Sequence, residues 1–202
     1  MAVFSFSGSF IGEGLTYHQY RMGLHALLKH PPSAESALKM MPYIQRNQEL
    51  MDEYDQSYRI SDELRGVMAA VPFLNWVVIT EGWCGDAAFN IPMFALLEQL
   101  FPEKIKLRLY LRDKNPGLMD AYLTEGGRSI PKLVLLDSSL QEVGTWGPRP
   151  AALMQLLPQW KESGDPLKEL IRKTHEWYNN DRTISLQSEL VSLLSSTSVR
   201  TK

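Results

Sequence analysis

The sequence predicts an α/β domain in which helices flank a mixed sheet, and three stretches of the chain carry this prediction. Residues 74–80 (LNWVVIT) form a short apolar, β-branched run, which is typical of a buried strand. In residues 105–111 apolar side chains alternate with Lys, Arg and Tyr, as in a strand with one buried face. Residues 132–137 and 140–145 are two further strand-like segments around Ser138-Ser139, which indicates a hairpin.

Helical patterns precede, separate and follow these strands. Thr16 and Gln19 have capping-box spacing at the start of a first helix, which Pro31-Pro32 must end. In the next helix, over residues 44–58, Pro42 either occupies the first turn or introduces a kink. Further helices are expected over residues 61–70, 87–101, 117–125 (ending at Gly126-Gly127), 166–179 and 184–194, and one begins near Pro150.

Length and composition limit the function classes. A chain of 202 residues fits one large domain, or a small one with additions. A net charge of −2 argues against a dedicated nucleic-acid binder, which would need a basic face. No apolar run is long enough to span a bilayer, and the N-terminus lacks the pattern of a secretory signal. We therefore expect no membrane association and a cytoplasmic location.

Cys84 is the single cysteine of the chain, which excludes an internal disulfide. It also excludes zinc or iron–sulfur sites built from several thiolates of one chain. His18 and His25 are seven residues apart, but no third ligand has suitable spacing. The sequence therefore predicts neither a metal site nor a cofactor.

The position of Cys84 in the predicted fold suggests a reactive thiol. It lies where a buried strand gives way to a helix, and the unpaired N–H groups and dipole at a helix start stabilise a thiolate. The carboxylates of Glu81 and Asp86 would oppose ionisation if they lie close. Asp86 would alternatively accept the thiol proton, or accept N–H bonds as a helix-start residue. The residues alone leave these alternatives open.

Four separated features resemble the thioredoxin family. The loop Glu81–Ala87 (EGWCGDA) is similar to its Trp-Cys-Gly-Pro-Cys loop, and Pro92 falls where the family's active-site helix is kinked. Ser129–Leu136 is similar to the segment whose proline, here Pro131, is cis and faces the cysteine. Trp146-Gly147-Pro148 falls where the family has a glycine at the edge of its substrate groove.

The resemblance implies a domain organisation. A thioredoxin-like mixed sheet over residues 71–160 would carry a helical N-terminal extension over 1–70 and a C-terminal one over 161–202, all in one compact unit. More narrowly, the chain resembles bacterial thioredoxin-like proteins that share the EGWCGDA loop and an N-terminal helical extension.

The departures from the family pattern limit what carries over. Ala87 occupies the position of the second, resolving cysteine, and Asp86 that of the proline between the two. Val78 occupies the position of a buried acid that assists proton transfer. Because a chain with one thiol cannot release a mixed disulfide by itself, the dithiol reductase role of the family does not carry over.

The leading hypothesis is a monothiol cycle in which Cys84 exchanges disulfides with help from an external thiol. Its partners would be that thiol or a disulfide-bearing protein, and a homodimer is also compatible with the sequence. The alternative is a redox-inert binding module for an extended peptide or protein partner. A peroxidase function is a weaker hypothesis, because the Thr and Arg that are usually arranged about such a cysteine are not recognisable here.

The site residues of this hypothesis come from the loop and the proline segment. Cys84 and Asp86 would be the catalytic pair. Arg128, and less favourably Arg149, would hold a carboxylate of a glutathione-like thiol, although solvated or salt-bridged arginines are the simpler reading. The remaining groove residues are Trp83, Ile130, Pro131, Trp146 and Gly147.

Overall fold

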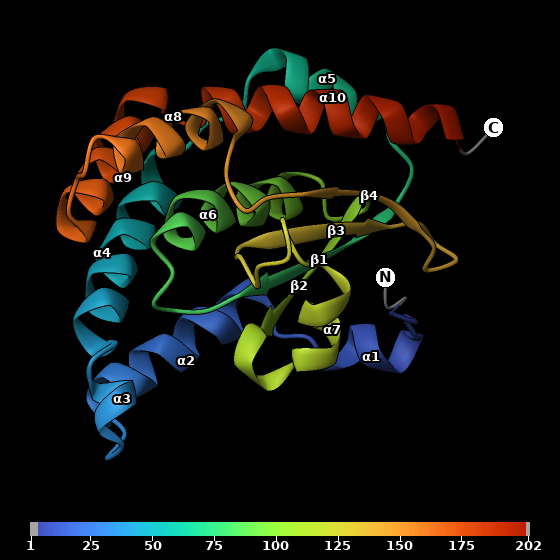
Figure 1. Ribbon diagram of the computed structural model, residues 1–202. Coiled ribbons are helices and arrows are strands. Elements are labelled where there is room, and N and C mark those ends of the chain that lie inside the picture. Colours follow the sequence, from blue (N-terminus) through green and yellow to red (C-terminus); the bar gives the residue numbers. More distant parts are fainter. Residues whose placement is uncertain (1–3, 201–202) are drawn as a thin grey trace.

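The computed structural model, which describes residues 4–200, contains a four-stranded mixed sheet with helices on both sides (Figure 1). The strands are β1 (Leu74–Thr80), β2 (Ile105–Leu111), β3 (Lys132–Leu136) and β4 (Glu142–Trp146). Their order in the sheet is β2-β1-β3-β4, with β1 parallel to β2 and antiparallel to β3, and β4 antiparallel to β3. The predicted fold class is therefore confirmed.

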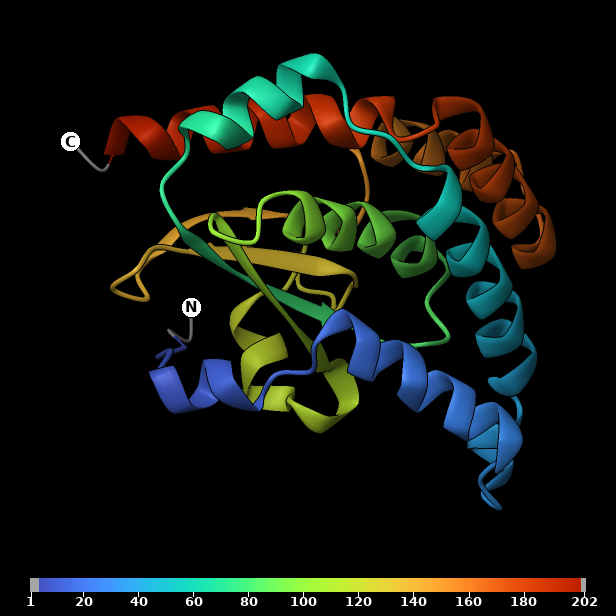
Figure 2. The same ribbon diagram turned by 180° about the vertical axis from the view of Figure 1, so that it is seen from behind.

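The described helices follow the predicted order, with short additions. They are α1 (Gly8–Glu13), α2 (Tyr17–Lys29), α3 (Glu35–Leu38), α4 (Met41–Ser57), α5 (Asp62–Ala70), α6 (Gly85–Leu100), the 3-10 helix η1 (Arg112–Lys114), α7 (Pro116–Ala121), α8 (Ala151–Glu162), α9 (Leu167–Asp181) and α10 (Ile184–Arg200). Two opposite views place α1, α2 and α7 on one side of the sheet and α5, α6 and α10 on the other (Figures 1 and 2). No helix of the described part is long and apolar enough to cross a bilayer.

Burial explains why β1 and α6 are so apolar. All seven residues of β1 are buried, because the strand lies inside the sheet and is covered on both faces. α6 is apolar around most of its circumference, since it packs on the sheet and also against α4. Trp76 of β1 meets Phe94 of α6 edge to face, with ring centroids 5.7 Å apart. The turn between β1 and α6 is therefore held by the most buried part of the protein.

The predicted helix boundaries agree with the structure at several points. The N–H of Gln19 donates to Thr16 Oγ1, and the N–H of Thr16 donates to Gln19 Oε1, so the capping box is complete. α2 ends at Lys29, before Pro31, and Pro42 lies in the first turn of α4. These signals are local in sequence, which is why the pattern alone was sufficient.

The helix predicted over residues 117–125 is wrong at its end. α7 stops at Ala121, and the chain then makes a tight turn in which Thr124 and Gly127 exchange two backbone hydrogen bonds of 2.9 Å. Glu125 and Gly126 both have positive φ, which is incompatible with a continuing right-handed helix. The two glycines therefore belong to a turn and not to the end of the helix.

No pattern in the sequence indicated α1, which packs on the outer edge of the sheet. Leu15 forms an antiparallel bridge with Leu109 of β2, and Phe10 stacks on Tyr110 with ring centroids 4.5 Å apart. The Tyr110 hydroxyl also donates to the backbone oxygen of Phe10. Such a short helix depends on contacts with distant residues, so its own six residues carry little signal.

Candidate functional site

Cys84 is the residue that precedes α6, at the end of the loop that follows β1. Its side chain is buried, with 7% of its surface exposed. The thiol donates a hydrogen bond of 3.3 Å to the backbone oxygen of Ile130. The Ile130–Pro131 peptide bond is cis. The predicted loop and proline segment thus lie in contact, with the sulfur between them.

Cys84 lines a cavity of about 350 Å³. We call this hollow the Cys84 cavity. Its lining residues come from the β1–α6 turn, from η1, from the segment before β3 and from the turn after β4: Trp83, Cys84, Gly85, Asp86, Arg112, Arg128, Ser129, Ile130 and Arg149. A hollow of this size accepts a small ligand or one or two residues of a peptide.

The surroundings of the sulfur favour the neutral thiol. Burial and the negative charge of Asp86 raise the pKa of Cys84 from its ordinary value of 9.0 to about 12. Hydrogen bonds from the backbone N–H groups of Ala87 and Asp86, at the start of α6, lower this pKa but do not outweigh burial. Cys84 is therefore protonated at neutral pH, in agreement with its role as donor to Ile130.

The Asp86 carboxylate is held by groups other than the thiol. Arg149 reaches it with two nitrogens, at 2.8 and 2.6 Å, and the Tyr178 hydroxyl donates to it at 3.0 Å. Asn90, one helical turn further along α6, donates to the Tyr178 oxygen at 3.1 Å. Burial raises the pKa of Asp86, whereas Arg149 and Tyr178 lower it. Asp86 thus links α6 to α9 and to the turn after β4.

Comparison with known proteins agrees with this architecture. A family model described as "Thioredoxin" matches residues 35–161, more than half of the chain. The chain belongs to this thioredoxin family. The matched region begins in α3, so it includes helices before β1 as well as the sheet.

Two solved structures resemble this thioredoxin-family chain over most of its length. One is the protein of unknown function PA1234 from Pseudomonas aeruginosa, with a TM-score of 0.59 and 15% identity over 95% of this chain and 98% of that one. The other is an HIV epitope-scaffold, with a TM-score of 0.60 and 14% identity over the same shares. At these identities the likeness concerns the fold alone. No curated protein matches the chain.

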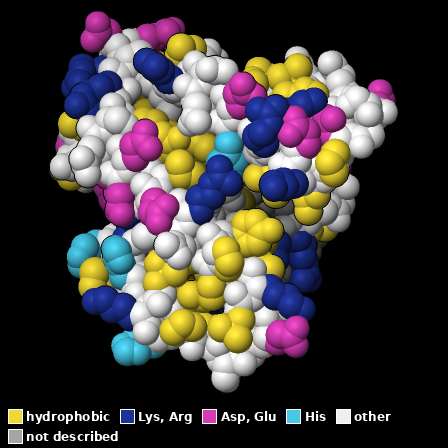
Figure 3. All heavy atoms as spheres, turned by 90° about the vertical axis from the view of Figure 1, so that its left-hand side faces the viewer, with side chains coloured by type: hydrophobic (Ala, Val, Ile, Leu, Met, Phe, Trp, Pro, Cys, Tyr) yellow, Lys and Arg dark blue, Asp and Glu magenta, His cyan; other side chains and the backbone are white. Residues whose placement is uncertain are grey.

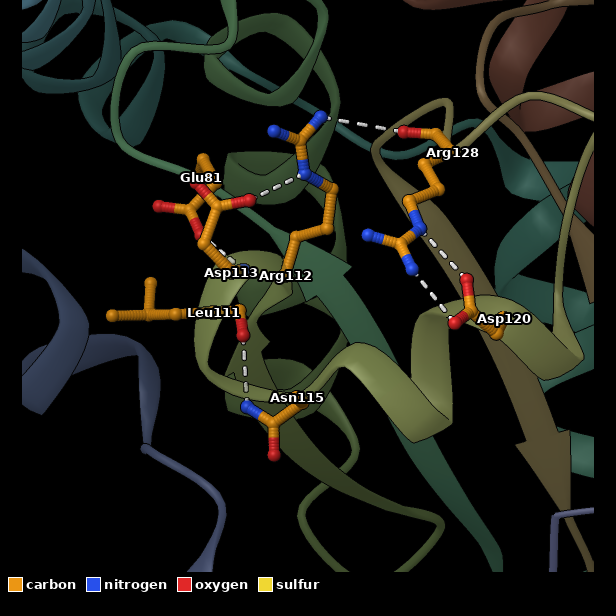
Figure 4. A network of polar contacts seen from close by, with 7 residues as sticks. All are labelled: Glu81, Leu111, Arg112, Asp113, Asn115, Asp120 and Arg128. Atoms are coloured by element: carbon orange, nitrogen blue, oxygen red, sulfur yellow. Dashed lines mark hydrogen bonds and ion pairs between the residues drawn. The ribbon is translucent and has the colours of Figure 1, made fainter. Parts of the chain in front are cut away.

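The two arginines considered for ligand binding are both paired with carboxylates in the thioredoxin-family domain. Arg128 makes two parallel hydrogen bonds of 2.7 Å to Asp120 (Figure 4). Arg149 is bonded to Asp86, as described above. A ligand carboxylate would therefore have to displace an existing partner from either side chain, which lowers the net gain in binding.

Arg112 is a cavity residue that the sequence did not single out. Its guanidinium lies over the Trp83 ring at 4.7 Å from the centroid, and it bonds to Asp113 and to the backbone oxygen of Arg128 (Figure 4). The Glu81 carboxylate accepts a hydrogen bond from the backbone N–H of Asp113, so this donor, and not the thiol, is its partner. No motif in η1 could have revealed Arg112, because its contact with Trp83 depends on the packing of two loops.

Trp146 and Gly147 have different surroundings from Trp83. The Trp146 indole is buried, donates to Glu189 of α10 at 2.6 Å and meets Phe94 edge to face. Glu189 also accepts from the backbone N–H of Ala151, which ties α10 to the start of α8. Gly147 has a φ of +109° and lies directly against the backbone oxygen of Pro131. Neither residue lines the Cys84 cavity.

The loop that carries Trp83 is also fixed from outside the sheet. Asn47 of α4 donates a hydrogen bond of 2.9 Å to the backbone oxygen of Gly82, and both residues are buried. Leu24 of α2 lies so close to Gly82 that a side chain there would overlap it. The helices before β1 therefore position the Cys84 loop.

Within residues 4–200, no three His, Cys, Asp or Glu side chains are placed to hold a metal ion.

Replacing Tyr178 by phenylalanine should lower the free energy of unfolding by about 1–2 kcal/mol. The substitution keeps the ring, which stacks on Phe89, but removes the hydroxyl between Asp86 and Asn90. Chemical denaturation of both proteins measures the loss. Tyr122→Phe is the matched control, because its hydroxyl bonds to Glu142 at an exposed position. Equal losses for the two variants would contradict a buried network around Asp86.

Proposed function

We propose that this chain is a thioredoxin-fold binding module that holds an extended peptide segment of a partner protein in the Cys84 cavity, with Cys84 as a neutral thiol. The observation that carries the proposal is the state of the sulfur. A thiol that is buried, protonated and bonded to Ile130 contributes to packing beside the cavity. Only a small fraction of it is the nucleophilic thiolate, because its pKa is raised. The sequence favoured disulfide exchange over binding, whereas the burial and the raised pKa of the thiol support binding.

The backbone beside the cavity supports binding of an extended chain. Within residues 4–200 the N–H of Ile130 has no hydrogen-bond partner, although the residue lines the cavity. An unpaired N–H at the margin of a hollow is suited to the main-chain pairing by which domains add a peptide strand. Trp83, which is half-buried, adds an apolar surface for a side chain of that peptide.

A second candidate function is monothiol exchange, and one observation favours it. The backbone N–H groups of Ala87 and Asp86, at the start of α6, lower the pKa of the sulfur, as expected of groups that stabilise a thiolate. In that cycle the Cys84 thiolate attacks a substrate disulfide, forms a mixed disulfide and releases one substrate thiolate. An external thiol then attacks the mixed disulfide, restores Cys84 and leaves bonded to the other half of the substrate.

A displayed peptide library, selected on the protein under reducing conditions, distinguishes the two functions. Selected peptides should bind wild-type protein and the Cys84→Ser variant with the same affinity, because the thiol forms no bond to the ligand. Binding should also slow hydrogen exchange at the Ile130 amide, which would acquire a carbonyl partner. Anisotropy of labelled peptides and exchange measured by NMR provide the readouts.

Two tryptophan variants locate the bound peptide. Trp83→Ala should weaken binding by about tenfold or more, as expected when a cavity aromatic is removed. Trp160→Ala, on α8 and outside the lining of the Cys84 cavity, should have no effect. Capture by wild-type protein alone, as an adduct that a reducing agent releases, would instead establish exchange.

A further inference from the structure

A second pocket of about 270 Å³ lies on the other side of the Cys84 loop, between α4, α8 and α9. We call it the α9 pocket. It shares four lining residues with the Cys84 cavity: Trp83, Gly85, Asp86 and Arg149. The two hollows are therefore separated only by the loop and the Asp86–Arg149 ion pair. The proposed peptide site accounts for the first hollow and leaves the second without a role.

One wall of the α9 pocket is apolar. Leu157 of α8 and Leu170 and Ile171 of α9 supply it, and each is only partly buried. At the mouth, Leu167 is 71% exposed and Tyr43 is 46% exposed, among the most exposed large hydrophobic side chains of the described part. Figure 3 shows this face of the molecule, with hydrophobic side chains around a hollow and Lys and Arg side chains beside it. An exposed apolar group of this kind is typical of a ligand surface.

The charged residues of the α9 pocket leave an excess of positive charge. Arg46 and Lys161 line it, and neither makes an ion pair within residues 4–200. Arg149 is neutralised by Asp86, the one acidic residue of the lining. His175 adds no charge at neutral pH, because burial lowers its pKa to about 4. Two unpaired cations beside an apolar wall are complementary to an amphipathic anion.

We propose that the α9 pocket binds a small amphipathic carboxylate, a molecule with an unbranched apolar chain and one anionic end. The chain would lie along Leu157, Leu170 and Ile171, and the carboxylate would bond to Arg46 and Lys161. This assignment does not depend on a peptide in the Cys84 cavity or on the chemistry of the thiol. It concerns free monomeric ligands, and a pocket of this volume suits a medium-length chain better than a long one.

Calorimetric titration of the full chain with sodium octanoate tests the proposal, with 1-octanol as the matched neutral ligand. Octanoate should bind with a millimolar or lower Kd, as expected for a ligand of this size. Octanol should bind at least about tenfold more weakly, because it lacks the charge that the two cations recognise. Acetate, which has the charge and no chain, should not bind measurably.

Substitutions at the exposed cations keep the test independent of folding. Arg46→Gln and Lys161→Gln should each weaken octanoate binding by about tenfold and leave octanol binding unchanged. Arg65→Gln, on α5 and outside the pocket, is the control for an equal loss of charge. Cys84→Ser should bind octanoate like the wild type, which separates this result from the peptide site.

Three results would overturn the assignment. Octanol that binds as tightly as octanoate would reduce the pocket to a non-selective apolar patch. An Arg65→Gln variant that binds as weakly as Arg46→Gln would attribute the effect to net charge. A titration of the wild type with octanoate that releases no heat and changes no chemical shift at the α9 amides would show that octanoate does not enter the pocket.

Discussion

Cys84 should react with a small alkylating reagent at pH 7 about a thousandfold more slowly than an exposed cysteine. The reactive species is the thiolate, and a rise in pKa from 9.0 to about 12 lowers its population by that factor. The limited exposure of the sulfur acts in the same direction. Because Cys84 is the single cysteine, mass spectrometry of the whole chain follows the reaction without interference.

The pH dependence of alkylation identifies the cause. The rate should still be rising at pH 10, since the titration midpoint lies above that value. The same chain unfolded in urea should react at the ordinary rate, which shows that the fold protects the thiol. A midpoint near 8.5 or below in the folded protein would favour the exchange function over the binding function.

Asp86→Asn tests the electrostatic part of the same prediction. Loss of the carboxylate removes a negative charge near the sulfur and frees the Arg149 guanidinium, and both changes lower the pKa of Cys84. The variant should therefore react faster than the wild type at every pH below the midpoint. Asp120→Asn, which frees Arg128 on the exposed side of the cavity, should have a smaller effect. A rate that does not change in Asp86→Asn would attribute the raised pKa to burial alone.

The elements that surround Cys84 could be predicted because their signals are local. β1 and β2 have the predicted boundaries, since seven consecutive residues carry each pattern. The position of Cys84 between β1 and α6 follows from those patterns. The sequence left the effect of Asp86 open, and the structure shows that its negative charge raises the pKa of Cys84.

What the sequence did not provide depends on contacts between distant segments. Arg128 and Arg149 stood out as candidate ligand-binding residues, but their carboxylate partners belong to other elements. Tyr178 reaches Asp86 from 92 residues away, which no spacing rule anticipates. The degree of burial of the sulfur also depends on contacts between distant segments, and it is the observation on which our proposal of binding rests. The sequence therefore predicted the elements around Cys84, whereas the surroundings that bear on its chemistry depend on tertiary packing.

Gly147→Ala should lower the free energy of unfolding by roughly 2–4 kcal/mol. A Cβ atom at this position would lie 2.3 Å from the backbone oxygen of Pro131, and the φ of +109° is itself unfavourable for alanine. Because the overlapping atom belongs to the backbone, the strain can be relieved only by moving the segment that carries Ile130. The peptide affinity of the Cys84 cavity should fall in the same variant.

Gly164→Ala is the matched control: its φ is +79°, but a Cβ there meets no atom within 4 Å, so it should lose about 1 kcal/mol. Urea denaturation of the two variants separates backbone conformation from close approach. Equal losses would show that the contact between Gly147 and Pro131 does not hold the cavity in shape.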